Sequence, residues 1–314
     1  MSLVKRRRQD ETVVAKSRDD VFTLEGHDGT VMAAKFDREG RVLATGGMDK
    51  KILLWSLPHV NQRGAPNYGE ITGHKSAITS LRWLNSGLLA SSSADSTVAI
   101  WDAETGKKIR KLNKHSMVVN EIDQDSNLVA SVGDDGFVQI WDTQSKDPVS
   151  SFQTDYPLIT VAFHRGIVYA SGIEPVIRAW DIKSSTKPLF EIETMHTDTI
   201  TSIAVDDSNL ISRSNDDTLR IYDPSVVEGT HIRPQIYDGA PSGGENLPIR
   251  AIIRENVIYS GSSDNTVTSW DVTSKRLLRK TAGHSGTVID IDEHMGKLAS
   301  TSVDGKVILR YTSA

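Results

Sequence analysis

The chain has 314 residues, a formal net charge of −5 at pH 7 and no cysteine. Disulfide bridges and thiolate metal sites are therefore excluded. No run of about 18 apolar residues occurs, so no membrane-spanning helix is expected, and the first residues lack the apolar core of a secretory signal.

The beginning of the chain differs in charge from the rest. Residues 1–18 carry six basic and two acidic side chains, a net charge of +4, which leaves −9 for residues 19–314. We expect residues 1–19 to form a disordered basic tail, although the run Lys5–Arg8 could also be a nuclear import signal or an arm that contacts RNA. The acidic remainder argues against a non-specific nucleic-acid binder, since such binders neutralise phosphates.

A phrase repeated seven times occupies the rest of the chain. In each copy an acidic residue is followed six positions later by a tryptophan or its replacement. In five copies a histidine precedes the acidic residue by 20 to 22 positions, and successive copies are about 43 residues apart. In chain order the pairs are Asp49 and Trp55, Asp95 and Trp101, Asp135 and Trp141, Glu174 and Trp180, Asp216 and Tyr222, Asp264 and Trp270, and Asp304 and Arg310.

Short apolar runs between these residues, such as 31–36 and 78–81, are typical of strands joined by tight turns. The period, the Gly-His beginning and the Trp-Asp end resemble the WD40 repeat. This resemblance implies an all-β, seven-bladed WD40 β-propeller over residues 20–314. Because the segment 21–24 precedes the first Gly-His pair, we expect it to join the last blade, so that the N-terminal strand closes the ring.

The repeated His, Ser or Thr, Asp and Trp side chains are interpreted as structural. In WD40 blades the indole bonds the hydroxyl, the hydroxyl bonds the imidazole, and the imidazole bonds the carboxylate, which satisfies buried polar atoms. A catalytic triad would occur only once. Blades 5 and 7 keep partial sets, around His196 and His284. The complete tetrads expected are His27, Thr45, Asp49 and Trp55; His74, Ser91, Asp95 and Trp101; and His115, Ser131, Asp135 and Trp141.

Other chemistry is not indicated. The remaining histidines show no metal-ligand spacing, and no glycine-rich phosphate loop opens a helix, so neither a metal nor a cofactor nor an enzymatic activity is expected. Blades 4 and 6 lack the histidine. Residues 224–248 hold four prolines and four glycines and are predicted to be either a partner-binding segment or a mobile surface loop.

The irregular copies resemble one WD40 family in particular. Its members lack the histidine of blade 4 and have a Phe-Gln … Tyr phrase there, as at Phe152 and Tyr156. They close a long insertion on Asn-Leu … Arg, as at Asn246 and Arg250, and lose the last tryptophan, as at Arg310. From about residue 22 to 309 the chain resembles the 40 kDa WD-repeat proteins of the U5 small nuclear ribonucleoprotein, although Glu174 stands where that family usually has Asp.

The resemblance implies a nuclear, non-catalytic scaffold of the U5 particle and the tri-snRNP in pre-mRNA splicing. As a monomeric subunit of a hetero-complex, it would dock on the large U5 scaffold protein and reach RNA mainly through protein neighbours. The alternative is an adaptor of another complex, such as a ubiquitin-ligase substrate receptor or a signalling β-subunit-like protein. Residues beside the repeated Asp and His are expected to be exposed and to bind the partner, namely Met48, Met117, Tyr156 and Arg213.

Overall fold

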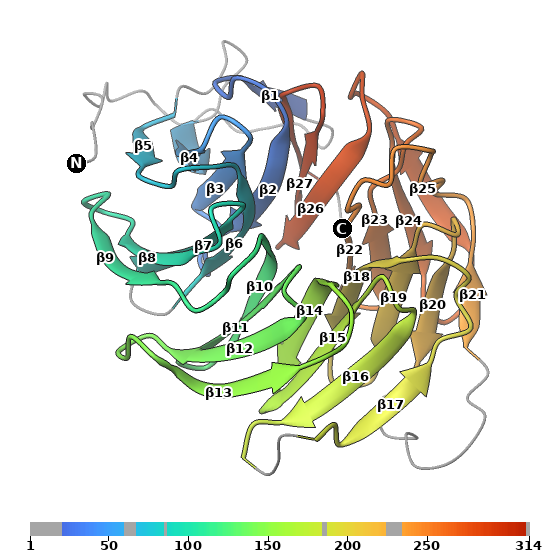
Figure 1. Ribbon diagram of the computed structural model, residues 1–314. Coiled ribbons are helices and arrows are strands. Elements are labelled where there is room, and N and C mark those ends of the chain that lie inside the picture. Colours follow the sequence, from blue (N-terminus) through green and yellow to red (C-terminus); the bar gives the residue numbers. More distant parts are fainter. Residues whose placement is uncertain (1–20, 60–66, 85–86, 184–186, 224–233, 312–314) are drawn as a thin grey trace.

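The computed structural model describes residues 21–59, 67–84, 87–183, 187–223 and 234–311 (Figure 1). The basic tail predicted over residues 1–19 lies outside these ranges. The described chain forms seven four-stranded sheets arranged in a ring, which confirms the all-β, seven-bladed propeller. It includes the short 3-10 helix η1 (Leu57–His59), and no described helix is long and apolar enough to cross a membrane.

Each blade is an antiparallel sheet whose strands follow one another in the chain, except in the last blade. From the inner to the outer strand the blades are as follows. Blade 1 contains β2 (Val31–Phe36), β3 (Val42–Gly47), β4 (Lys51–Ser56) and β5 (Gly69–Thr72); blade 2 contains β6 (Ile78–Trp83), β7 (Leu88–Ser93), β8 (Val98–Asp102) and β9 (Lys108–Leu112); blade 3 contains β10 (Val119–Asp125), β11 (Leu128–Gly133), β12 (Phe137–Asp142) and β13 (Pro148–Gln153); blade 4 contains β14 (Leu158–His164), β15 (Ile167–Gly172), β16 (Val176–Asp181) and β17 (Phe190–Glu193); blade 5 contains β18 (Ile200–Val205), β19 (Leu210–Ser214), β20 (Leu219–Tyr222) and β21 (Gln235–Tyr237); blade 6 contains β22 (Ala251–Arg254), β23 (Val257–Ser260), β24 (Val267–Asp271) and β25 (Leu277–Thr281); and blade 7 contains β26 (Val288–His294), β27 (Lys297–Ser302), β28 (Val307–Tyr311) and β1 (Val21–Leu24).

The ring is closed by the two ends of the described chain. Strand β1 pairs antiparallel with β28, with Val21 opposite Arg310 and Leu24 opposite Val307. The side chain of Leu24 is buried in a cluster that joins blade 7 to blade 1. The expectation that the N-terminal strand closes the ring is therefore confirmed.

Large apolar side chains fill the junctions between neighbouring blades. One cluster, for example, combines Ile52 and Leu54 of blade 1 with Leu81 and Leu89 of blade 2. Every Trp of the repeated phrase is fully buried. Because each small sheet must cover a face with the next sheet, the blades depend on one another for burial.

Side chains of one blade also accept hydrogen bonds from backbone N–H groups at the inner edge of the next blade. An inner strand has backbone N–H groups that no further strand of its own sheet can pair, and buried groups of this kind need a partner. Carboxylates and hydroxyls of the preceding inner strand accept these bonds at several junctions. Asp290 accepts from Ala34 N (3.0 Å), Glu121 from Val161 N (3.1 Å), Thr160 from Ile203 N (2.8 Å) and Ser202 from Ala251 N (3.0 Å).

Truncating the buried side chain of the closing strand tests this arrangement. We expect Leu24→Ala to lower the free energy of unfolding by about 2–5 kcal/mol, because the change leaves a cavity in the closing junction. The neighbouring Thr23 is exposed, so Thr23→Ala is the matched control and should change stability little. Urea unfolding of both variants measures the difference, and equal stabilities would contradict the role of β1.

Candidate protein-interaction site

The three complete tetrads have nearly identical geometry. In blade 1 the imidazole of His27 lies 2.9 Å from the Asp49 carboxylate and 2.8 Å from the Thr45 hydroxyl, to which the Trp55 indole donates at 2.9 Å. The corresponding distances are 3.0, 2.8 and 2.7 Å in blade 2. In blade 3 they are 2.9, 2.8 and 2.8 Å. Each tetrad thereby ties the loop before an inner strand to the second and third strands of the same blade.

The electrostatics of the tetrads suit a structural role. Burial alone would raise the pKa of Asp95, but hydrogen bonds from Thr97, from Lys75 N and from His74 outweigh it and lower the pKa to about 2. Burial lowers the pKa of His74 against the opposing effect of Asp95, so the imidazole is neutral at pH 7. Because the Ser91 hydroxyl is fully buried and shared between two partners, it is not available as a nucleophile.

Two blades keep the imidazole but replace the tryptophan. His196 bonds Asp216 and Ser212, both at 2.8 Å, and Tyr222 donates its hydroxyl to the Thr194 carbonyl at 2.9 Å. In blade 7 the His284 imidazole lies 3.2 Å from Asp304 and 2.9 Å from Ser300. There the guanidinium of Arg310 donates to the Ala282 carbonyl. Each replacement therefore ties the third strand to the loop that follows the outer strand of the preceding blade.

Blade 4 has no tetrad. The Trp180 indole N–H is buried with no hydrogen-bond partner among the described residues, and its ring stacks on Phe152 with centroids 5.5 Å apart. Glu174, which replaces the usual Asp, pairs instead with Arg178 at 2.6 Å. Arg178 also bonds Glu191 at 2.9 Å. The turn that carries Glu174 is thus tied to the third strand by an ion pair, and stacking packs Trp180 against blade 3.

Blade 6 also lacks the histidine, and part of the predicted loop takes its place. Residues 224–233 lie outside the described ranges, whereas Gln235–Tyr237 is the outer strand of blade 5. The Trp270 indole donates to the carbonyl of Asp238 at 3.0 Å, and Ala240 and Ile249 are fully buried. The interpretation as a mobile surface loop is therefore wrong for residues 238–242, because their backbone carbonyls accept hydrogen bonds from Arg213 and Trp270. Residues 243–246 are exposed, and for them a partner-binding segment or a surface loop stays a prediction.

The expectation that Arg213 is exposed is also wrong. Its side chain is 0% exposed, and its guanidinium donates to the Ser242 hydroxyl at 3.0 Å and to the Ala240 carbonyl at 3.1 Å. It also reaches the Gly261 carbonyl at 3.4 Å. Burial lowers the pKa of Arg213 to about 10, with Asp217 opposing, so the group remains charged at pH 7. Arg213 therefore fastens the segment after β21 between blades 5 and 6 and does not face a partner.

The loops of the tetrad histidines and the turns of the tetrad aspartates lie on one face of the ring, which we call the tetrad face. The other three predicted contact residues are exposed on this face. Met48 is 57% exposed on blade 1, Met117 is 51% exposed on blade 3 and Tyr156 is 49% exposed on blade 4. Two further apolar side chains of this face are exposed, Ile173 at 51% and Met195 at 68%. They directly precede Glu174 and His196, as Met48 precedes Asp49, so the same position rule could have found them.

Four of these residues lie on successive loops of blades 3 and 4 on this face. We call them the blade 4 rim and define it as Met117, Tyr156, Ile173 and Met195. Hydrogen bonds hold their loops together. The amide of Ile173 donates to the Pro157 carbonyl at 3.3 Å, and the hydroxyl of Thr194 donates to the Pro175 carbonyl. The Asn120 amide bridges Asp134 and the Leu158 carbonyl, both at 2.7 Å. A pre-ordered surface with clustered apolar side chains is typical of a protein-interaction site.

Comparisons with known proteins place the chain in a family. The model of the WD domain, G-beta repeat, matches residues 18–56, 66–102 and 106–142, and each match contains one complete tetrad. The chain is 36% identical to pre-mRNA-splicing factor cwf17 of Schizosaccharomyces pombe over 90% of its own length and 85% of the relative. It is 34% identical to the U5 small nuclear ribonucleoprotein 40 kDa protein of Dictyostelium discoideum, over 94% and 85% of the two chains. The human protein of that name is 32% identical over 87% and 78%.

The chain belongs to the U5 40 kDa family of WD40 proteins. These similarities extend well beyond the three copies that the repeat model matches, and they therefore include the blades in which the tetrad is partial or missing. Across the described residues of this family member, no group of three or more metal-binding side chains occurs.

The pH dependence of stability tests the tetrads. Because the pKa of Asp95 falls from 3.8 to about 2 on folding, its ionised form stabilises the fold above pH 3.8, and this contribution is lost as the pH falls through about 2. We expect Asp95→Asn to cost roughly 1–3 kcal/mol at pH 7 and the difference from wild type to narrow between about pH 4 and 2. Urea unfolding over this range measures it, with the exposed Asp28→Asn as control. A difference of constant size would contradict the account.

The burial of Arg213 gives a second test. Arg213→Ala should lower the free energy of unfolding by roughly 2–5 kcal/mol, because it leaves a cavity and buried carbonyls without a donor. Arg276 is exposed, so Arg276→Ala is the matched control. If thermal unfolding is the same for Arg213→Ala as for wild type, the hydrogen bonds of Arg213 do not stabilise the fold.

Proposed function

We propose that this protein is a non-catalytic interaction scaffold of the U5 small nuclear ribonucleoprotein and the tri-snRNP in pre-mRNA splicing. The supporting observation is its similarity, along most of both chains, to relatives named as a splicing factor and as U5 40 kDa proteins. A nuclear location and protein partners of the U5 particle follow from this proposal. The partner proposed for direct docking is the large U5 scaffold protein.

The blade 4 rim is the surface proposed for this docking. Its loops are held by hydrogen bonds within blade 4 and between blades 3 and 4, so little ordering entropy is lost when a partner binds. Exposed methionine and tyrosine side chains are enriched in the cores of protein interfaces. Met48 lies on the same face but on blade 1, and we propose it as a peripheral contact.

The charge of the propeller supports recognition of proteins over direct binding of RNA. Residues 19–314 carry a net charge of −9, and nucleic-acid affinity depends largely on neutralising phosphates. Contact with RNA would then be made mainly through protein neighbours. Within this proposal the protein is a monomeric subunit that performs no chemistry, and its rigid ring presents one partner surface in a fixed geometry.

Affinity capture from native nuclear extract, with and without nuclease, tests the function. We expect U5 RNA and the large U5 scaffold protein to co-purify with the tagged chain, and the contact with that protein to survive nuclease treatment. Recovery of ubiquitin-ligase or signalling subunits without small nuclear RNA would instead favour the alternative, an adaptor of another complex.

Charged substitutions in the rim test the docking surface. The double variant Tyr156→Asp and Ile173→Asp should reduce capture of the large scaffold protein at least about tenfold, which corresponds to about 1.4 kcal/mol of binding free energy. Met295, at the β26–β27 turn on the opposite face, is 79% exposed, so Met295→Asp is the matched control and should capture normally. Thermal unfolding checks that both variants remain folded, and undiminished capture by the double variant would discard this surface.

A further inference from the structure

The side chain of Arg250 crosses the centre of the ring. Arg250 directly precedes β22 of blade 6, and its guanidinium pairs with the carboxylate of Glu121 in β10 of blade 3. The same guanidinium donates to the Asn120 carbonyl at 3.2 Å. Blades 3 and 6 are not neighbours, because blades 4 and 5 separate them on one side and blades 7, 1 and 2 on the other (Figure 1). The contact therefore spans the central channel.

Arg250 occupies a position that other blades use for a hydrogen-bond acceptor. Thr160 of blade 4 and Ser202 of blade 5 each accept a backbone N–H of the next blade, at 2.8 and 3.0 Å. Each of these three residues directly precedes the residue whose N–H bonds the preceding blade. An arginine side chain has donors and no acceptor. It cannot accept from the next blade, so its donors need acceptors elsewhere.

The backbone of Arg250 is firmly held in blade 6. Its N–H donates to the Ile289 carbonyl at 2.7 Å, and its carbonyl accepts from Gly261 N at 3.2 Å. The carbonyl of the preceding residue, Ile249, accepts from the Thr201 hydroxyl at 2.9 Å. Because neighbouring blades fix the chain on both sides of it, Arg250 provides a rigid point from which its side chain can reach across the channel.

The carboxylate that Arg250 reaches joins four blades. Glu121 belongs to blade 3, accepts from Val161 N of blade 4 at 3.1 Å, and lies 3.7 Å from the Arg82 guanidinium of blade 2. Arg82 has a closer partner in Asp123, at 2.8 Å. Glu121 and Arg250 are both buried, so water and salt screen their attraction weakly. Removing either partner leaves the other charge buried without compensation.

Asn120 connects this contact to the blade 4 rim. Its carbonyl accepts from Arg250, while its side-chain amide donates to the Asp134 carboxylate and to the Leu158 carbonyl, both at 2.7 Å. Leu158 begins the inner strand that follows the loop of Tyr156. The residue that ties the loops of blades 3 and 4 together is therefore itself bonded from the far side of the channel.

We propose that Arg250 is a positioning residue for the blade 4 rim, which it holds from blade 6 through Asn120 and Glu121. The use of this rim for docking rests on the proposed function, whereas the coupling across the channel does not. Two blades that share no sheet face are thus joined by side chains, so the position of the rim depends on a residue outside blades 3 and 4.

Hydrogen–deuterium exchange of the free, full-length protein tests the coupling. In Arg250→Met we expect the amides of residues 154–161 to exchange at least about tenfold faster than in wild type, and those of residues 27–36 in blade 1 to change less than about twofold. A general loss of stability would instead speed both segments equally, because amides that exchange through complete unfolding follow the global free energy.

Arg254 provides the matched control. It lies on the same inner strand, is exposed, and pairs at 3.7 Å with Asp292 of the adjacent blade 7. Arg254→Met should leave exchange of residues 154–161 unchanged. Arg250→Lys keeps the positive charge but not the forked geometry that serves two acceptors. It should show the same difference between the two segments at a smaller size, which also covers the case in which Arg250→Met does not fold.

A double-mutant cycle shows whether the effect passes through Glu121. Glu121→Gln removes the charge and keeps an oxygen that can accept from Val161 N. It should also speed exchange of residues 154–161. The double variant with Arg250→Met should exchange more slowly than the product of the two single effects, because both changes break the same contact.

Equal acceleration of both segments in Arg250→Met, or effects that multiply fully in the double variant, would overturn the inference. Capture of the large U5 scaffold protein is a separate measurement, in which Arg250→Met should capture at least about threefold less than wild type and Arg254→Met should capture normally. Normal capture by Arg250→Met would overturn its role in docking. If wild type itself captures no such partner, the proposed function fails, and the exchange measurement still decides the coupling.

Discussion

The pairing of β1 with β28 is the contact on which the rest of the structure depends. Each blade is a small four-stranded sheet that buries its faces only against its two neighbours. If the ring opened at this junction, blade 7 would lose its outer strand, and the cluster around Leu24 and Leu309 would be exposed. A closed ring also leaves only short sheet edges, which limits unwanted pairing with other chains.

Much of the fold could be predicted because the tetrads need particular side chains at fixed separations. An indole, a hydroxyl, an imidazole and a carboxylate must all lie within hydrogen-bond distance, as Trp101, Ser91, His74 and Asp95 do. The period of these residues therefore predicts the number of blades and the closure of the ring. The same rule predicts the exposed positions Met48 and Met117 next to them, but it also predicts Arg213, which is buried.

The parts that could not be predicted depend on contacts with the backbone. The acceptors of Arg213 include the carbonyls of Ala240 and Gly261, and backbone carbonyls carry no residue-specific signal in a sequence. The same is true of Trp270, whose partner is the carbonyl of Asp238. Blades 5 and 6 replace side-chain tetrads by such bonds, so only the structure distinguishes a buried arginine from an exposed one.

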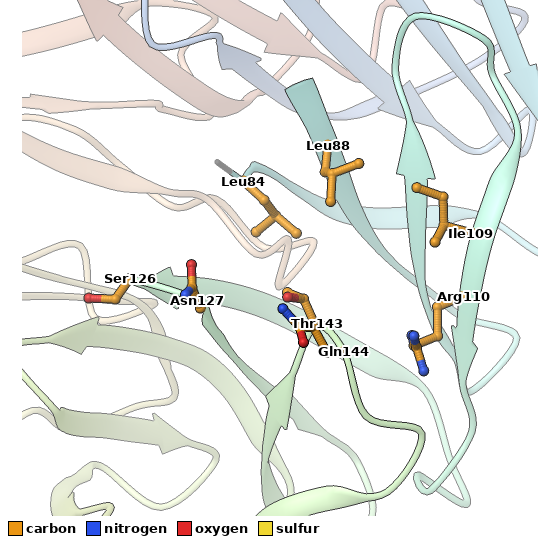
Figure 2. A pocket seen from close by; sticks show the side chains of 8 residues that line it. All are labelled: Leu84, Leu88, Ile109, Arg110, Ser126, Asn127, Thr143 and Gln144. Atoms are coloured by element: carbon orange, nitrogen blue, oxygen red, sulfur yellow. The ribbon is translucent and has the colours of Figure 1, made fainter. Parts of the chain in front are cut away.

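The two faces of the ring offer different chemistry. The tetrad face carries the blade 4 rim beside the blade that lacks a tetrad, whereas the opposite face carries a pocket between blades 2 and 3 with an aliphatic and polar lining (Figure 2). The closed ring fixes the positions of these two surfaces relative to one another.

Hydrogen–deuterium exchange of the protein, free and within the purified U5 particle, tests the central claim most directly. The account predicts slower amide exchange in the particle for residues 113–118, 154–158, 172–176 and 194–198, which form the loops of the blade 4 rim. Unchanged exchange in all four segments, with slowing confined to other parts of the ring, would contradict docking through this rim.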